Sequence, residues 1–329
     1  MSKIDDTIKA RADWNARFGL KDVAQLNTAI REGRSGDIIR TTEALQEKQL
    51  ASIAEEIASR PKVKIVLLAG PSSSGKTSTS KRLAVQLMTC LKRPLTLSMD
   101  NWFVNREDTP LDENGEKDYE SIYALDLKQF NQDLQDLIDG KEIQIPTFNF
   151  QLGQREYKGQ TLQLQDDNIL IIEGIHALNP ILTEKIAAEN KYLVYASALT
   201  ALRLDEDTRI STSDNRLIRR MCRDYSTRGC SAEDTLSRWP SVRRGEEKWI
   251  FPFQENADAI FNTAMVYELS ALYPKAIKVL SEVPADSPMM PEAHRLLHFL
   301  TFFVPIPDKE IPMNSLLREF IGGSVFDVG

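Results

Sequence analysis

The chain has 329 residues, 42% of them hydrophobic and 27% charged, which excludes a disordered chain and leaves room for one large α/β domain with an appendage. No apolar run reaches the ~20 residues of a bilayer span, and a net charge of −7 (41 basic against 48 acidic residues) argues against non-specific nucleic-acid binding. The three cysteines lack CxxC spacing and residues 1–6 are polar, so we expect no disulfide framework, no cysteine zinc site, no secretory signal and a cytoplasmic location.

Residues 1–60 have a helical pattern and predict an N-terminal extension. Apolar residues recur at spacings of three and four from Ala44 to Ile57. Thr41 and Thr42 are suitable caps for the start of this helix, and Pro61 is a suitable stop.

Residues 61–265 alternate between short aliphatic runs and amphipathic segments. Strands are predicted at 63–69, 95–99, 169–172, 192–196 and 259–261, and helices at 76–91 and 125–138. A polar loop is predicted at 105–117, and a small β-hairpin insertion near 143–165 with arms at 143–150 and 161–164. The fold class is therefore α/β, a parallel sheet with helices on both faces. Residues 266–329 predict a helical C-terminal extension interrupted by prolines.

The segment GPSSSGKT at residues 70–77 matches the pattern GxxxxGK[ST] in full, between a predicted buried strand and a predicted helix. Its glycines allow the backbone to wrap phosphates, and its amide groups lie at the positive end of the helix dipole. Lys76 is expected at the β- and γ-phosphates, and the Thr77 hydroxyl on Mg²⁺. The predicted nucleotide-binding residues are Gly70, Ser72, Ser73, Ser74, Gly75, Lys76, Thr77 and Ser78.

Two carboxylates follow neighbouring predicted strands, where open α/β sheets bind their ligands. We predict that Asp100 is the general base for an attacking hydroxyl and that Glu173 holds the metal or its waters, with the two roles interchangeable. The alternative for each residue is a carboxylate that caps the next turn.

An arginine stripe predicts a lid over residues 214–230. Arg216, Arg219, Arg220 and Arg223 share one helical face, and Arg228 follows. Of the nearby acids only Asp224 is placed to relieve their repulsion, so a phosphate is the expected partner. A solvated helix surface is the alternative.

Aromatic residues cluster between the second strand and the hairpin: Trp102, Phe103, Tyr119, Phe148 and Phe150. Phe148 and Phe150 share a strand face and would form a wall for a flat base, although a hydrophobic core under the hairpin has the same spacing. His176 lies close to the predicted site and is a further candidate for substrate contact.

At these residues the sequence resembles the uridine kinase/phosphoribulokinase family of P-loop kinases. The resemblance is carried by GPSSSGKTS at 70–78, SMDNWF at 98–103, IPTFNF at 145–150, IIEGIHALNP at 171–180 and RLIRRMCRDYSTRG at 216–229. The nearest likeness is to a bacterial branch in which the kinase follows threonyl-tRNA-synthetase-like domains, and residues 1–60 resemble the connector behind those domains.

The resemblance implies roles for particular residues. It implies that Asp100 is the catalytic aspartate, that Arg220, Arg223 and Arg228 contact triphosphate and substrate, and that Lys76, Arg223 and Arg228 are catalytic by neutralising the transferred group. Residues at nucleoside-contacting or base-packing positions are Phe103, Tyr119, Glu120, Phe148 and Phe150. Two positions depart from the uridine–cytidine kinases: Gly153 replaces a base-reading histidine, and Cys230 replaces a lid arginine.

The expected activity is transfer of the γ-phosphate of ATP or GTP, with Mg²⁺, to the 5′-hydroxyl of uridine or cytidine. The alternatives are a P-loop kinase for another small alcohol such as a sugar phosphate, and a nucleotide-binding regulatory module with little transfer. The expected partners are the nucleotide and a small-molecule nucleoside, without nucleic acid or membrane, and a homo-oligomer is left open.

Overall fold

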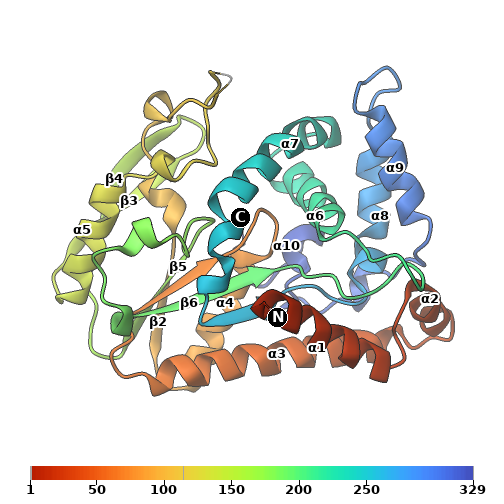
Figure 1. The fold of residues 1–329 in the computed structure, drawn as a ribbon, viewed down its shortest axis with the longest axis horizontal. Coiled ribbons are helices and arrows are strands. Elements are labelled where there is room, and N and C mark those ends of the chain that lie inside the picture. The colour runs from red at the N-terminus through yellow and green to blue at the C-terminus, as the bar shows by residue number, and fades with distance from the viewer. Residues whose placement is uncertain (1, 114, 329) are drawn as a thin grey trace.

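A five-stranded parallel sheet forms the centre of the computed structural model, which describes residues 2–113 and 115–328 (Figure 1). Its strand order is β2-β5-β1-β6-β7. The strands are β1 (Ile65–Ala69), β2 (Arg93–Ser98), β5 (Asn168–Glu173), β6 (Lys191–Ser197) and β7 (Ala259–Asn262). Glu173 is paired with Leu68 of β1 and with Ser98 of β2, so three strands end together at one edge. This edge is where the sequence predicts the site, and the predicted parallel α/β fold is confirmed.

Helices cover both faces of the sheet. They are α1 (Lys3–Arg17), α2 (Val23–Arg31), α3 (Ser35–Ser59), α4 (Lys76–Thr89), α5 (Leu127–Ile138), α6 (Thr212–Thr227), α7 (Ala232–Trp249), α8 (Glu268–Ser281), α9 (Met290–Leu300) and α10 (Arg318–Ile321). Successive strand residues point to opposite faces. Accordingly Val66 and Leu68 pack in one cluster with α3, α4, α6 and α8, whereas Ile65 and Leu67 pack in another with α5. Figure 1 shows α5 and α9 on opposite sides of the molecule.

The N-terminal extension packs closely against the sheet and α4. The helix predicted to start at Thr41 or Thr42 begins earlier, at Ser35, and the Thr42 hydroxyl donates to the carbonyl of Ile38 at 2.7 Å within the helix. The capping prediction is therefore wrong, because a β-hydroxyl can also bond one turn back inside a helix. Farther along the chain, the buried Arg82 of α4 donates to Gln46 and to Glu47 of α3, each at 2.8 Å.

The hairpin insertion consists of β3 (Ile143–Asn149) and β4 (Gln154–Leu162), which pair antiparallel. The second arm was predicted only over 161–164, which is too short. Most of β4 is polar and exposed, so it lacks the alternation that marks a half-buried strand. Asn114, within the predicted polar loop, and the end residues Met1 and Gly329 lie outside the described residues.

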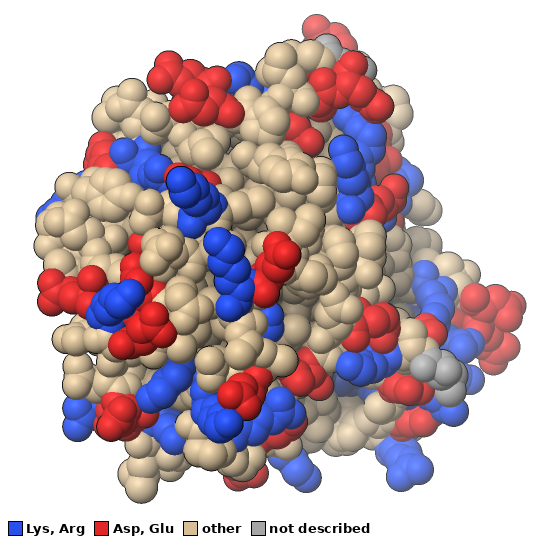
Figure 2. Space-filling view, turned by 60° about the vertical axis from the view of Figure 1, so that its left-hand side comes forward, with Lys and Arg blue, Asp and Glu red and all other residues tan. Residues whose placement is uncertain are grey.

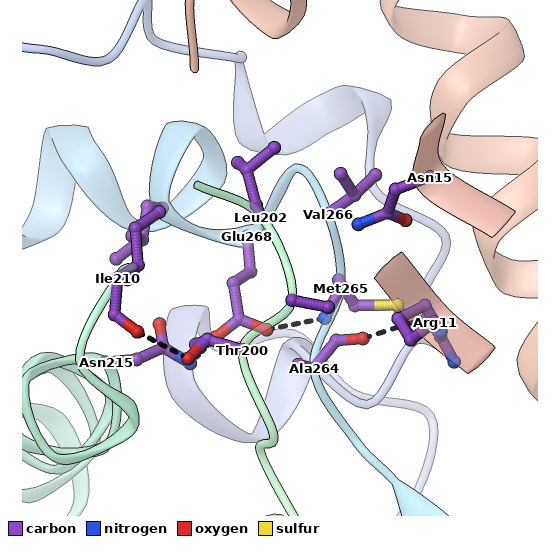
Figure 3. A pocket seen from close by; sticks show the side chains of 12 residues that line it. Arg11, Asn15, Thr200, Leu202, Ile210, Asn215, Ala264, Met265, Val266 and Glu268 are labelled. Carbon is purple, nitrogen blue, oxygen red and sulfur yellow. Dashed lines mark hydrogen bonds between the residues drawn. The ribbon is translucent and has the colours of Figure 1, made fainter. Parts of the chain in front are cut away.

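Both extensions meet the core around a small cavity of about 20 Å³, enough for roughly one water (Figure 3). Arg11 of α1 donates to the carbonyl of Ala264 at 3.2 Å, and the amide of Met265 donates to Glu268 at 2.7 Å. Burial lowers the pKa of Arg11 to about 10. The cavity thus lies where α1, α6 and α8 converge.

Lysine and arginine alternate with aspartate and glutamate over the face that Figure 2 brings forward, which is the side of α5 and the hairpin in Figure 1. None of the helices in the described part of the chain combines the length and the apolar character that a bilayer span requires.

Candidate active site

The loop between β1 and α4 has the backbone that its glycines predict. A Cβ at Gly70 would lie 2.0 Å from the carbonyl oxygen of Ala196, so only glycine allows this close approach. Gly75, the N-cap of α4, has a φ of +85°, and Ser73 adopts a φ of +56°. A left-handed backbone costs little conformational energy for glycine and more for serine. The surrounding loop must therefore offset this cost at Ser73.

One pocket of about 410 Å³ gathers most of the predicted site residues at the carboxyl edge of the sheet. From the phosphate loop, the strand ends, the hairpin and α6 it collects Ser72, Ser73, Gly75, Lys76, Thr77, Asp100, Phe103, Tyr119, Glu120, Phe148, Phe150, Glu173, Arg220, Arg223 and Arg228. Its volume is in the range that binds small ligands.

Four predicted residues do not line this pocket. Gly70 packs behind the loop against β6. The carbonyl of Ser74 accepts from the Thr263 hydroxyl at 2.6 Å, and the Ser78 hydroxyl donates to Glu319 at 2.7 Å. His176 is buried beside Trp249, its ring edge-on at 6.5 Å, and burial lowers its pKa to about 4, so the imidazole is neutral.

The titratable groups at the centre of the pocket are strongly desolvated. Burial raises the pKa of Glu173 to about 7, opposed by Lys76 and reinforced by Asp100. Burial also raises the pKa of Asp100 and lowers that of Lys76. The Thr77 hydroxyl donates to Glu173 at 3.2 Å, and the Lys76 ammonium donates to the carbonyl of Pro71 at 3.2 Å. A carboxylate and a hydroxyl oxygen therefore lie together beside a lysine and a second acid.

The arginine stripe divides into a structural pair and a pocket-facing set. Arg216 and Arg219 are buried and form ion pairs with Glu246 of α7 and Glu268 of α8. The carboxylates of these two helices offset the mutual repulsion of Arg216 and Arg219. The interpretation that these two arginines need a phosphate as partner is therefore wrong.

The remaining arginines surround Asp224, as the sequence suggested. Its carboxylate is 3.3 Å from Arg220, 2.8 Å from Arg223 and 3.6 Å from Arg228. Arg220 also donates to the Ser72 hydroxyl at 2.8 Å, which joins this group of arginines directly to the phosphate loop. One carboxylate shared among three guanidinium groups leaves donors free for a further anion.

The aromatic residues form a wall at the hairpin side of the pocket. The rings of Phe103 and Phe148 lie edge to face at 5.6 Å, and those of Phe148 and Phe150 at 5.2 Å. Tyr119 and Phe150 are exposed at 54% and 60% of their surface, which a purely structural core would not leave open. Trp102 belongs instead to the core, where its indole donates to Asp133 at 2.7 Å.

Sequence reasoning missed Arg106, Arg238 and Glu319, all of which line the pocket. Arg106 donates to the carbonyl of Phe150 at 2.6 Å, and a Cβ at Gly153 would lie 2.8 Å from its side chain. The replacement of the family's histidine by Gly153 could have indicated that another side chain takes its place, because Arg106 fills the space next to that glycine. Glu319 lies in LLREFIGGS at 316–324, a segment that also resembles the family, but nothing in that segment indicates that it reaches a pocket at the other end of the chain.

A glycine-rich loop on a helix N-terminus, two partly buried acids at the ends of strands and a group of arginines are the parts of a phosphoryl-transfer site. The fold and the site together define a P-loop kinase, a phosphotransferase. The sequence model described as the Phosphoribulokinase / Uridine kinase family matches residues 65–270. The chain belongs to this family.

Similar proteins carry kinase names. A protein named uridine kinase from Macrococcus caseolyticus (strain JCSC5402) is 28% identical over 200 residues, 60% of this chain and 87% of that protein. One from Staphylococcus aureus (strain JH9) is 28% identical over 197 residues, 60% of this chain and 86% of that one. A solved structure described as a possible uridine kinase from Bacillus stearothermophilus has a TM-score of 0.43 at 17% identity, covering 65% of this chain and 97% of that one. The D-glycerate 3-kinase of Cryptococcus neoformans has a TM-score of 0.44 at 12% identity, covering 63% and 89%.

Proposed function

We propose that this protein transfers the γ-phosphate of ATP or GTP to the 5′-hydroxyl of uridine or cytidine. The observation that carries the proposal is the single pocket in which a phosphate loop, two acids, an arginine group and an aromatic wall meet. A phosphate donor and a flat acceptor fit end to end in such a pocket.

The donor end suits a nucleoside triphosphate with Mg²⁺. Ser73 lines the pocket, and its buried hydroxyl has no hydrogen-bond partner among the described residues, which leaves it free for a phosphate oxygen. Glu173 and Thr77 offer the carboxylate and hydroxyl oxygens that Mg²⁺ prefers. When bound there, the ion would neutralise charge on the phosphates.

The acceptor end suits a nucleoside. Phe148, Phe150 and Tyr119 present apolar ring surface to the pocket, against which a pyrimidine would pack. In this arrangement Asp100 accepts the proton of the 5′-hydroxyl as that oxygen attacks the γ-phosphate. The raised pKa of Asp100 makes it a stronger base than an exposed aspartate. Lys76 and Arg223 stabilise negative charge on the transferred group.

A second candidate acceptor is a sugar phosphate. Arg106 favours it, because a guanidinium beside the aromatic wall is a natural partner for an anionic group on the acceptor. The carbonyl oxygens of a pyrimidine would also accept from this side chain, so Arg106 is compatible with both candidates.

The test is ADP release with Mg²⁺ and ATP or GTP across uridine, cytidine, adenosine, guanosine, inosine and ribulose 5-phosphate. We expect the highest kcat/KM for uridine or cytidine, with modest discrimination among nucleosides because Gly153 offers no side-chain hydrogen bond to the base. Lys76→Ala is the control and should abolish turnover. Turnover confined to ribulose 5-phosphate would show that the acceptor is a sugar phosphate and not a nucleoside. Nucleotide binding without turnover would indicate a regulatory module.

A further inference from the structure

The start of α4 already has an anion bound to it, supplied by the chain itself. Ser78 is the third residue of this helix, and the first amide groups of a helix have no partner inside it. The amide of Ser78 donates to Glu319 at 3.2 Å, and its hydroxyl donates to the same carboxylate oxygen at 2.7 Å. These are the kind of donors that a phosphate uses at a helix N-terminus.

The carboxylate is held there by the C-terminal extension. Leu316 packs over Gly75 so closely that an added Cβ there would lie 2.8 Å from it. The neighbouring Phe320 is fixed by the Arg219 guanidinium, 4.9 Å from its ring centre, and by the Lys275 ammonium, which donates to its carbonyl at 2.7 Å. Glu319 itself is only 6% exposed, and it lines the pocket.

The charge of Glu319 also opposes a phosphate chain. The guanidinium of Arg223 is 4.0 Å from the carboxylate of Glu319. Glu319 therefore accepts from two donors that a phosphate could use, and its charge offsets part of the positive charge of Arg223. It also adds a third acid to the pocket that Asp100 and Glu173 line.

We propose that Glu319 is an internal competitor of the donor's phosphates: its carboxylate occupies the Ser78 donors, and nucleotide binding must displace it. The proposal rests on the proposed function, because it assigns the phosphate loop to a nucleoside triphosphate. The C-terminal extension then sets the affinity for the donor below the value that the loop alone would reach.

The test is calorimetric titration of the full chain with MgATP, with Glu319→Ala as the main variant. We expect Kd to fall about tenfold, the effect of removing one competing charged hydrogen bond. Glu319→Gln keeps the side-chain volume should the alanine variant not fold, and it should shift Kd in the same direction. Glu310→Gln is the control, because that exposed carboxylate of the same extension accepts from Ser35 instead, at 2.7 Å.

Thermal unfolding separates competition from mere structural support. Both Glu319 variants should melt below the wild type without nucleotide, yet gain more in Tm from saturating MgATP. If ATP binds the wild type but binds the variants equally or more weakly, the competition is refuted and the proposed function stands. If no protein, wild type included, binds MgATP, the proposed function fails and the inference fails with it.

Discussion

Burial, more than any single neighbour, sets the protonation of the carboxyls in the pocket. It is the largest cause of the raised pKa at Asp100, at Glu120 and at Glu173. Lys76 opposes it most at Asp100 and Glu173, and Arg220 does so at Glu120. Glu120 and Glu173 both titrate at about pH 7, where small changes in their surroundings alter their charge.

Asp100→Asn is expected to lower kcat by about 10²-fold or more while leaving MgATP affinity nearly unchanged, because an amide cannot accept the proton. Steady-state kinetics and calorimetry check the two parts. Asp108→Asn, an exposed aspartate on the following turn, should behave as wild type. A variant whose Mg²⁺ requirement changes instead would mean that Asp100 and Glu173 exchange roles.

Glu120→Gln should raise stability at pH 8 but not at pH 4.5. Folding raises the pKa of Glu120 from 4.5 to about 7, so between these values the native state keeps a proton that the unfolded chain has lost. Stability from this group is therefore present below pH 4.5 and is lost as the pH rises to 7. Glutamine cannot ionise, so we expect a gain of about 1–3 kcal/mol at pH 8 by denaturant unfolding. Equal stability of the two proteins at pH 8 would contradict the shift.

At the scale of elements, α6 carries two differently placed sets of arginines along one face. Its first half is anchored by Arg216 and Arg219, whose side chains are at most 1% exposed. Its second half presents Arg220 and Arg223 to the pocket, and Arg228 follows directly after the helix. A helix whose first half is fixed and whose end presents arginines is a suitable support for the lid over phosphates that the sequence predicts.

The two halves of α6 should respond differently to alanine. Arg223→Ala is expected to keep Tm close to wild type, to lower kcat/KM and to raise ATP hydrolysis relative to transfer. Arg216→Ala should instead lower stability by about 1.5–3 kcal/mol, because the buried Glu246 loses its strongest ion pair and keeps Arg243 and the amide of Ser72 as partners. Thermal unfolding and the ratio of ADP to phosphorylated acceptor measure these effects. Loss of stability in Arg223→Ala with an unchanged product ratio would assign both arginines to structure.

At the scale of the whole molecule, both extensions belong to the core. Leu50 and Ile53 of α3, Leu272 of α8 and Leu296 of α9 share one hydrophobic cluster with the sheet residue Val66. Removing either extension would expose apolar surface of the sheet's helices, so we expect neither to be dispensable.

Arg82→Ala tests how much the contact between the N-terminal extension and α4 contributes to stability. Arg82 is 2% exposed and joins α4 to α3, so its loss should lower the free energy of unfolding by about 2–3 kcal/mol. Arg40→Ala is the matched control, since Arg40 is 73% exposed in its ion pair with Asp37 and should cost at most about 0.5 kcal/mol. Urea unfolding measures both, and similar values for the two variants would argue against a stabilising junction.

Local sequence patterns were sufficient for the sheet and the phosphate loop. The aliphatic runs before Gly70 and Glu173 leave few alternatives to buried parallel strands. The partners of Arg216 and Arg219 were not predictable, because Glu246 and Glu268 lie 30 and 49 residues away. Glu319 is 241 residues from Ser78, and one sequence does not indicate which distant acid returns to a loop.

The contacts of α1 have a consequence for how the chain folds. Lys3 donates to the carbonyl of Ala257, 254 residues away, and Arg11 to that of Ala264, 253 residues away. At about 5–20 residues per second, a ribosome needs about 10–50 s to make the intervening chain. For that time α1 lacks its partners around β7 and has only nearer contacts such as Gln49 of α3, to which Arg11 donates at 3.2 Å. Contacts of such long range form slowly in any case. Although α1 is made long before β7, it is therefore fixed in place only after β7 has joined the sheet.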